Sequence, residues 1–482
     1  MGKIKKNYIY NLAYQLLTLL APIITAPYLA RVLGADNLGI YTYVNASGNI
    51  IATLSLLGIY AYGNRQTAYV RDDRVKLTET FWELELTRLI LGAAGTAVYL
   101  VYATIHPVFR FYFLIYYPYI LAQFLDCSWI YVGMEDMKIP VTKNFITKLV
   151  NICGVFLLVR RRDDVWIYIL MLAVTTLAAN ISVYRQLPKY VGGPRYQLRH
   201  IPKHLKGSLH LFLPQAASLF YLQVDKVMLE WLTSETGQLS FYDQAEKIIT
   251  IPLSLITVLS TVMMPRLANE FRWGHRQKVE DLLLRAGKFS VFLACPMMMG
   301  MFCIARQFVP WYLGKEFLPT AYAMMALVPI VLFNSLAGIS GAQYYTATDQ
   351  IGIVLRAYVT AAAANVIVNA LLIPRWGYLG AAAATVLSSL LSVGVQYWYL
   401  AKQIRLHALW RDILRYLLLS AAMAAAVFLA TRRMPARIYT TALQIVFGAA
   451  VYLGLLLLTG DGMMKELFRE IKRLLCRRKE EG

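Results

Sequence analysis

The sequence predicts an all-α membrane protein whose chain crosses the bilayer about fourteen times. Of its 482 residues, 58% are hydrophobic and only 16% are charged, whereas soluble domains are about half apolar and a quarter charged. The apolar residues form fourteen blocks of about 20 residues, the length that a helix needs to cross ~30 Å of hydrocarbon. This pattern excludes a soluble enzyme and a disordered scaffold. It also excludes a transmembrane β-barrel, whose strands span only ~10 residues.

Each apolar block is expected to form one membrane-spanning helix. The first block follows a basic N-terminal flank but is too long for the apolar region of a signal peptide, so we interpret it as a retained helix. The hydrophilic stretches between blocks are too short to form a soluble domain. The predicted spans are 8–33, 38–63, 80–104, 110–133, 139–159, 166–187, 207–232, 239–265, 286–305, 318–345, 353–373, 377–401, 414–431 and 438–459.

The distribution of positive charge predicts the orientation of the chain. The formal net charge is +21, and 33 of the 48 Lys and Arg residues lie in one alternating set of flanks, 11 in the other and four within spans. Basic loops remain in the cytoplasm, so both termini are predicted to be cytoplasmic. The triplet Arg160–Arg162 lies on the opposite side and does not fit this rule. The positive-inside rule accounts for the basic charge, so no nucleic-acid partner is expected.

A weak internal repeat predicts two six-helix halves. The motif from Asn37 to Asn45 opens the second span, and a similar motif from Gln238 to Glu246 opens the eighth span 201 residues later. Internal repeats are common in transporters, where the substrate path lies between the halves. The predicted organisation is an N-terminal lobe with a basic linker at 1–206, a C-terminal lobe at 207–411, two additional helices at 412–460, and a basic amphipathic tail at 461–482 that would lie on anionic lipid.

The motifs of common enzyme classes are absent from the sequence. There is no Gly-rich phosphate loop or dinucleotide fingerprint, and the five cysteines show neither disulfide nor zinc spacing. His200 and His204 are spaced i, i+4, but no third metal ligand accompanies them. We therefore expect no catalytic residue, no metal and no cofactor, and a protein that is not an enzyme.

Ionisable residues inside the spans are the candidate functional residues. A charge at mid-bilayer costs ~3 kcal/mol on insertion scales, so its presence needs a reason. Cations in a cavity suit a phosphate-bearing substrate, because their donors replace lost water. Interhelical ion pairs are the structural alternative. The predicted cavity cations are Arg31, Arg88, Lys148, Lys226 and Lys247. The predicted cavity acids, which would balance these cations or couple transport to H⁺ or Na⁺, are Asp126, Asp225 and Glu246.

Aromatic residues are the second resource, because the chain contains 33 tyrosines. Most of the tyrosine clusters fall near span ends, where an aromatic belt is expected. Stacking of a carbohydrate on a few of these rings is the alternative, and the sequence does not select which rings would do so.

Several motifs resemble those of a known transporter family. The runs Asn11 to Pro22 and Pro27 to Tyr41 resemble the opening of Wzx-type polysaccharide flippases. Three later segments are similar to the central and C-terminal regions of that family's sequences. They are Asp225-Lys226, the run Tyr242 to Leu253 and the run Ile373 to Ala383. Ala30-Arg31-Val-Leu-Gly34 is also similar to a first-helix motif of lipid II flippases, in which the arginine belongs to a cationic cavity.

The resemblance implies the fold of the multidrug/oligosaccharidyl-lipid/polysaccharide exporter superfamily, with two six-helix lobes around a central cavity. It implies export of an undecaprenyl-diphosphate-linked oligosaccharide across the bacterial plasma membrane for capsule, O-antigen or a related surface polysaccharide, with polysaccharide assembly proteins as candidate partners. The expected mechanism is alternating access. The alternatives are a drug or small-molecule antiporter of the same fold and a membrane-embedded glycan polymerase or ligase.

Overall fold

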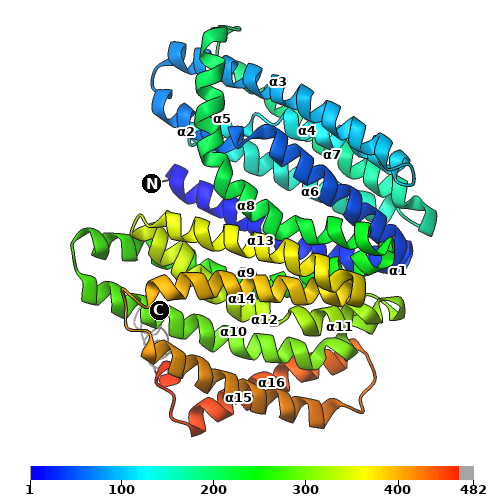
Figure 1. Ribbon diagram of the computed structural model, residues 1–482, viewed down its shortest axis with the longest axis vertical. Coiled ribbons are helices and arrows are strands. Elements are labelled where there is room, and N and C mark those ends of the chain that lie inside the picture. Colours follow the sequence, from blue (N-terminus) through cyan, green and yellow to red (C-terminus); the bar gives the residue numbers. More distant parts are fainter. Residues whose placement is uncertain (1, 466–482) are drawn as a thin grey trace. The chain divides into compact units, whose positions relative to one another are not determined.

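The computed structural model describes the backbone of residues 2–465, and every regular element in that range is a helix. Side chains are described in the same range except at 2–16, 19, 213–215, 217, 218, 220–222, 255 and 257–266. Figure 1 labels the helices. The earlier ones are α1 (Gly2–Leu56), α2 (Ile59–Val70), α3 (Arg74–Ile105), α4 (Arg110–Phe124), α5 (Ser128–Gly133), α6 (Lys138–Leu158), α7 (Val165–Tyr184) and α8 (Ile201–Thr233). The later ones are α9 (Thr236–Arg272), α10 (Arg276–Tyr312), α11 (Leu318–Leu327), α12 (Pro329–Ala337), the π-helix η5 (Gly338–Tyr345), α13 (Ile351–Trp376), α14 (Tyr378–Leu400), α15 (His407–Thr431) and α16 (Ile438–Leu458).

The helices confirm the prediction of an all-α multi-span protein. Each predicted span falls on one helix, on part of one, or on consecutive helices. In the described residues, eight helices are long and apolar enough to cross a membrane, and two bent pairs bring the number to as many as ten. α1 contains the first predicted span and most of the second, separated by Gly34, whose φ of 76° and ψ of 178° interrupt the helix. Glycine adopts positive φ without the steric cost that a side chain imposes.

The chain divides into two compact units. The first comprises the residues up to Asp243 together with Asn365–Ala381. In this unit α4 packs against α7, and α6 packs against α1 and α7. Figure 1 shows α3, α4, α6 and α7 running side by side. A buried cluster includes Phe81 and Trp129, whose rings stack with centroids 5.4 Å apart.

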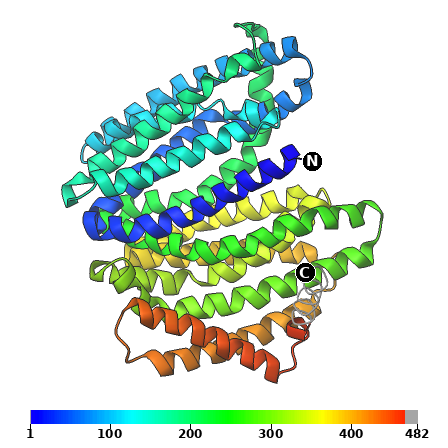
Figure 2. The ribbon, with the colours of Figure 1, turned by 180° about the vertical axis from the view of Figure 1, so that it is seen from behind.

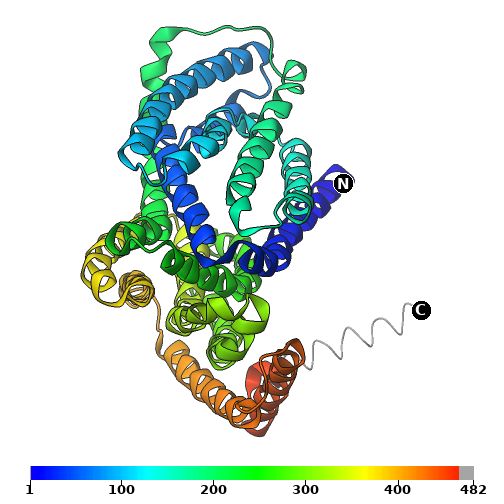
Figure 3. The ribbon, with the colours of Figure 1, turned by 90° about the vertical axis from the view of Figure 1, so that its right-hand side faces the viewer.

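The second unit comprises Gln244–Ala364 and the residues from Ala382 onward. Its centre is α10, which packs against α11, α12, α15 and α16. Figures 2 and 3 show α15 and α16, in orange and red, folded back on each other. The π-helix η5 is mostly buried and follows a 45° bend between α11 and α12.

The predicted lobe boundaries at 206 and 411 stay a prediction. The two compact units divide the chain at other positions, namely after Asp243 and at the two ends of Asn365–Ala381. The predicted amphipathic tail at 461–482 lies outside the described residues beyond position 465.

Candidate functional site

Arg88, one of the predicted cations, is buried in a polar cluster of the first unit. It lies on α3 and is 1% exposed. Its Nη2 donates to both carboxylate oxygens of Glu85 at 2.5 and 2.6 Å and to the Tyr184 hydroxyl on α7 at 2.7 Å. The Tyr184 hydroxyl in turn donates to Glu85 Oε1 at 2.6 Å. Among the residues whose side chains are described, none accepts a hydrogen bond from the Nε or Nη1 of Arg88, and a phosphate oxygen is a suitable acceptor for such donors.

Asp126, one of the predicted acids, pairs with a lysine that is not among the predicted site residues. Lys143 Nζ contacts Asp126 Oδ1 at 3.1 Å, Ser128 Oγ at 2.8 Å and Asn180 Oδ1 at 2.9 Å. Lys143 lies within α6, inside the predicted span 139–159, and its side chain is only 7% exposed. Its partners come from the α4–α5 region and α7 and are not adjacent in sequence, so no local sequence pattern indicates this cluster.

Asp225 and Lys226 are both buried on α8 but bind different partners. Asp225 accepts hydrogen bonds from the Tyr242 hydroxyl at 2.8 Å and from Asn369 Nδ2 at 2.5 Å. Lys226 Nζ forms an ion pair with Asp243 Oδ1 at 3.0 Å. Adjacent residues on a helix point about 100° apart, which separates the two sets of partners. Asn369 and Asp243 were not among the predicted site residues, although Asn369 was visible as a polar residue inside an apolar span.

The remaining predicted residues differ in exposure. Arg31 on α1 is exposed, and Lys148 on α6 is half-buried. In the described part of the chain Lys148 has no hydrogen bond or ion pair. Glu246 is half-buried and Lys247 is exposed on α9, in the second unit. The assignment of these residues to one substrate cavity stays a prediction.

His200 and His204, the two histidines spaced i, i+4, both contact the carboxylate of Glu83 on α3. His200 Nδ1 lies 2.7 Å from Glu83 Oε1, and His204 Nε2 lies 2.9 Å from Glu83 Oε2. The Tyr62 hydroxyl lies 3.3 Å from His204 Nδ1. These contacts attach the start of α8 to α3. Among the described residues, no group of three or more His, Cys, Asp or Glu side chains is arranged to hold a metal ion.

The second unit contains an apolar cavity of about 530 Å³. It lies between α10 and the pair α15 and α16, which correspond to the two predicted additional helices. Its lining includes Phe292, Met301, Met423, Ile445 and Leu453. A cavity with such a lining suits a hydrocarbon ligand.

Two families of known proteins match more than half of the chain each. The family described as "Polysaccharide biosynthesis protein" matches residues 4–270. The family described as "Lipid II flippase MurJ" matches residues 149–448. The two matched regions overlap and together extend over nearly the whole chain.

Individual relatives and a solved structure agree with these matches. The chain is 22% identical to the Escherichia coli (strain K12) protein named "Putative O-antigen transporter", over 70% of this chain and 83% of that protein. It is 24% identical to the "Probable low-salt glycan biosynthesis flippase Agl15" of Haloferax volcanii, over 54% of each chain. Its fold is similar to a structure of "Lipid II flippase MurJ, inward closed conformation", with a TM-score of 0.76, 18% identity, and coverage of 96% of this chain and 99% of that chain. The chain therefore belongs to the polysaccharide biosynthesis protein family of Wzx-type flippases, within the multidrug/oligosaccharidyl-lipid/polysaccharide exporter superfamily.

Proposed function

We propose that the protein is a flippase that moves an undecaprenyl-diphosphate-linked oligosaccharide across the bacterial plasma membrane by alternating access. The observation that carries this proposal is the match of more than half of the chain to each of two families, one described by polysaccharide biosynthesis and the other by lipid II flipping. The names of the relatives, an O-antigen transporter and a glycan flippase, support a lipid-linked glycan as the substrate class. Capsule, O-antigen or a related surface polysaccharide would be the product that receives the exported unit.

The buried charges support a role in binding the diphosphate. A diphosphate that enters an apolar environment loses hydration, and clustered cations can offset that cost. Within the described part of the chain, two of the predicted cations have donors that no residue accepts, namely Arg88 through Nε and Nη1 and Lys148 through its ammonium group. The proposed diphosphate-binding set remains Arg31, Arg88, Lys148, Lys226 and Lys247.

The apolar cavity beside α15 and α16 supports accommodation of the polyprenyl tail. Each buried CH₂ group contributes about 0.8 kcal/mol when it leaves water, so a long hydrocarbon tail remains in an apolar environment throughout transport. The polar head would cross through the protein while the tail stays in lipid or in this cavity.

Asp225 is the acid that we propose for coupling to H⁺ or Na⁺. Its carboxylate is 1% exposed and is hydrogen-bonded to Asn369, which in turn donates to Asn365 Oδ1 at 3.0 Å. A carboxylate near amide oxygens suits a hard cation such as Na⁺.

Reconstitution in lipid vesicles tests the function. A fluorescent undecaprenyl-diphosphate-linked oligosaccharide is placed in vesicles with and without the pure protein, and its access to a membrane-impermeant outer probe is timed. Faster access with no covalent change supports flipping. Equal rates with and without the protein would refute the proposal, and growth of the glycan chain, detected by mass spectrometry, would favour the polymerase alternative. Transport of a cationic dye without any effect on the glycan lipid would favour the drug antiporter.

A further inference from the structure

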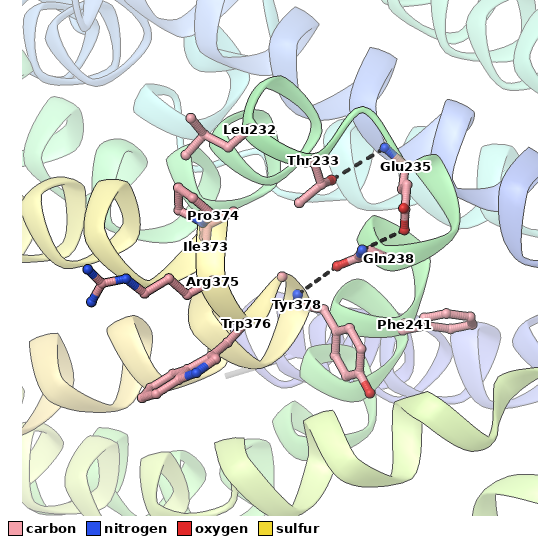
Figure 4. Close-up of a pocket in the computed structure, with 11 residues that line it drawn as sticks. Leu232, Thr233, Glu235, Gln238, Phe241, Ile373, Pro374, Arg375, Trp376 and Tyr378 are labelled. Carbon is pink, nitrogen blue, oxygen red and sulfur yellow. Dashed lines mark hydrogen bonds between the residues drawn. The ribbon is translucent and has the colours of Figure 1, made fainter.

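A polar cavity lies in the first unit where two interhelical turns meet. Its volume is about 610 Å³, within the usual range for small-ligand sites. One wall is the end of α8 and the start of α9, and the other is the turn between α13 and α14 (Figure 4). None of the residues discussed above as diphosphate or ion ligands lines it.

A chain of hydrogen bonds joins the two walls. Gln238 Oε1 accepts from the Tyr378 backbone N–H at 3.0 Å, and Gln238 Nε2 donates to Glu235 Oε2 at 2.6 Å. Figure 4 shows Gln238 between these two residues. Gly377 has a φ of 53°, and a Cβ there would lie 1.9 Å from Gln238 Oε1. The turn therefore requires glycine, and Gln238 holds the two walls together.

Aromatic side chains and two opposite charges complete the lining. Trp376 is 60% exposed, and the rings of Phe241 and Tyr378 meet at 72° with centroids 5.9 Å apart. Arg375 is exposed and makes no hydrogen bond or ion pair within the described part of the chain. Glu235 is exposed as well, and only its Oε2 is bound to Gln238.

This combination matches the surface of a sugar. A sugar ring presents hydroxyl groups, which planar polar side chains bind as donors and acceptors, and an apolar C–H face, which packs on an aromatic ring. One cation and one anion give the cavity no net charge, so it is poorly suited to a diphosphate. An anchor in the aromatic belt would explain the exposure of Trp376, but it would not explain the carboxylate, amide and guanidinium groups beside it.

We propose that this cavity is a carbohydrate-binding subsite that receives the glycan head group at the extracytoplasmic end of the transport path. The inference rests on the proposed function and on the proposed orientation, which places the α8–α9 and α13–α14 turns outside the cytoplasm. Trp376 would stack on a sugar ring, while Arg375 and Glu235 would bind its hydroxyl groups. Gln238 is a positioning residue.

Protection of an engineered cysteine tests occupancy without knowledge of the sugar. Leu232→Cys places a thiol on the cavity wall, where the native side chain is 42% exposed. Met434→Cys is the control, because Met434 is 36% exposed and lies in the α15–α16 turn, which is predicted to be on the same side of the membrane. Both are made with Cys153→Ser, since Cys153 is the exposed native thiol among the described residues. The probe is a membrane-impermeant maleimide added to intact cells of the native strain.

Strains that lack the first sugar transferase or the polymerase distinguish the lipid-linked unit from the finished polysaccharide as the ligand. Labelling of Leu232→Cys should be severalfold slower in cells that make the lipid-linked glycan than in cells lacking the first sugar transferase, while Met434→Cys should label equally in both. If protection persists after deletion of the polymerase, the ligand is the lipid-linked unit. If protection disappears after that deletion, the ligand is the finished polysaccharide, and the proposed place of the cavity on the transport path is wrong. Equal labelling of Leu232→Cys with and without glycan synthesis would overturn the subsite.

A second measurement separates binding from folding. Trp376→Ala should weaken the protection about twofold to tenfold, the range expected for the loss of one ring contact, and Trp376→Phe should restore most of it. Trp398→Ala is the matched control, because Trp398 is 57% exposed at the other end of α14. Equal thermal unfolding temperatures of the purified variants exclude misfolding. If the wild-type protein flips the glycan lipid in vesicles but Leu232→Cys is never protected, only the subsite fails; if it does not flip the lipid, the proposed function fails.

Discussion

Lys143 and Lys148 lie on the same helix, α6, but their surroundings differ. Lys143 contacts Asp126, Ser128 and Asn180 and is nearly inaccessible. Lys148 is half-buried and has no such partner in the described residues. A cation without an internal partner keeps its donors for a ligand, whereas a fully paired cation stabilises the fold. We therefore expect the two lysines to respond differently to removal of their charge.

Lys148→Gln should slow flipping by about tenfold or more, the effect of losing one charge-assisted hydrogen bond, without lowering the unfolding temperature. Lys148→Arg should keep most of the activity. Lys143→Met is the contrasting variant. It should lower the free energy of unfolding by about 3 kcal/mol, because it leaves the Asp126 carboxylate without its cation. Flipping rates in vesicles and thermal unfolding of the purified proteins measure both effects. Wild-type flipping by Lys148→Gln would remove Lys148 from the proposed site.

Variants of Lys226 and Asp243 test whether Lys226, a predicted cavity cation, binds substrate or only stabilises the fold through their ion pair. Lys226→Gln leaves Asp243 buried without this cation and should lower protein abundance and unfolding temperature. Addition of Asp243→Asn should restore both if the role of Lys226 is structural. If Lys226→Gln instead abolishes flipping at normal abundance and Lys226→Arg restores it, Lys226 binds substrate. The double-variant cycle, measured on the same preparations, decides between the two roles.

The sequence predicted where charges enter the membrane but not which residues they contact. Arg88 and Asp225 were found because an ionisable residue in an apolar block is rare. Their partners Tyr184 and Asn369 come from helices 96 and 144 residues away. A single sequence contains no local signal for such contacts, so it could not decide between ion pairing and substrate binding.

At the scale of the helices, the order of the spans followed from block length because each apolar block must cross the same hydrocarbon thickness. The interruptions were harder to predict. The break between α4 and α5 and the π-helix η5 lie inside the predicted spans 110–133 and 318–345, whereas the kink at Gly34 lies between the first two predicted spans and leaves them in one continuous helix assignment. Local backbone geometry and packing against neighbouring helices cause them, and hydropathy does not report either.

Gly39 on α1 marks a close approach between helices. A Cβ at this position would lie 1.8 Å from the backbone oxygen of Thr236 at the start of α9. Gly39→Ala should therefore separate α1 from α9 and lower the unfolding temperature. Gly394→Ala on α14 is the control, because no atom lies within 4 Å of its Cβ position. There alanine should raise stability slightly, since glycine costs about 0.5–1 kcal/mol in a helix. Equal effects of the two substitutions would contradict the close approach.

At the scale of the molecule, the first unit brings the two repeat motifs into contact. Thr42 Oγ1 donates to Asp243 Oδ2 at 3.3 Å, and these residues are 201 positions apart, the same separation as the two motifs. Thr42 and Asp243 thus occupy equivalent positions in the repeat. In a two-fold arrangement, a residue meets its own counterpart only near the axis. The internal duplication stays a prediction; in transporters, such a duplication places the substrate path between the halves.

The orientation of the whole chain gives the last prediction. Lys143 lies within α6, but the excess of basic residues in the other flanks of that set still predicts that both termini and the linker before α8 are cytoplasmic. At Gly193 no atom lies within 4 Å of the Cβ position, so an insertion there should be tolerated. A reporter that works only in the cytoplasm should be active when it is inserted after Gly193. A reporter that works only outside the cytoplasm should be active when it is inserted after Met434, in the α15–α16 turn. Alkaline phosphatase and a fluorescent protein that needs the cytoplasm are suitable paired reporters. The reverse pattern at both sites would show that the chain has the opposite orientation in the membrane. The proposed carbohydrate subsite would then lie at the entrance of the transport path and not at its exit.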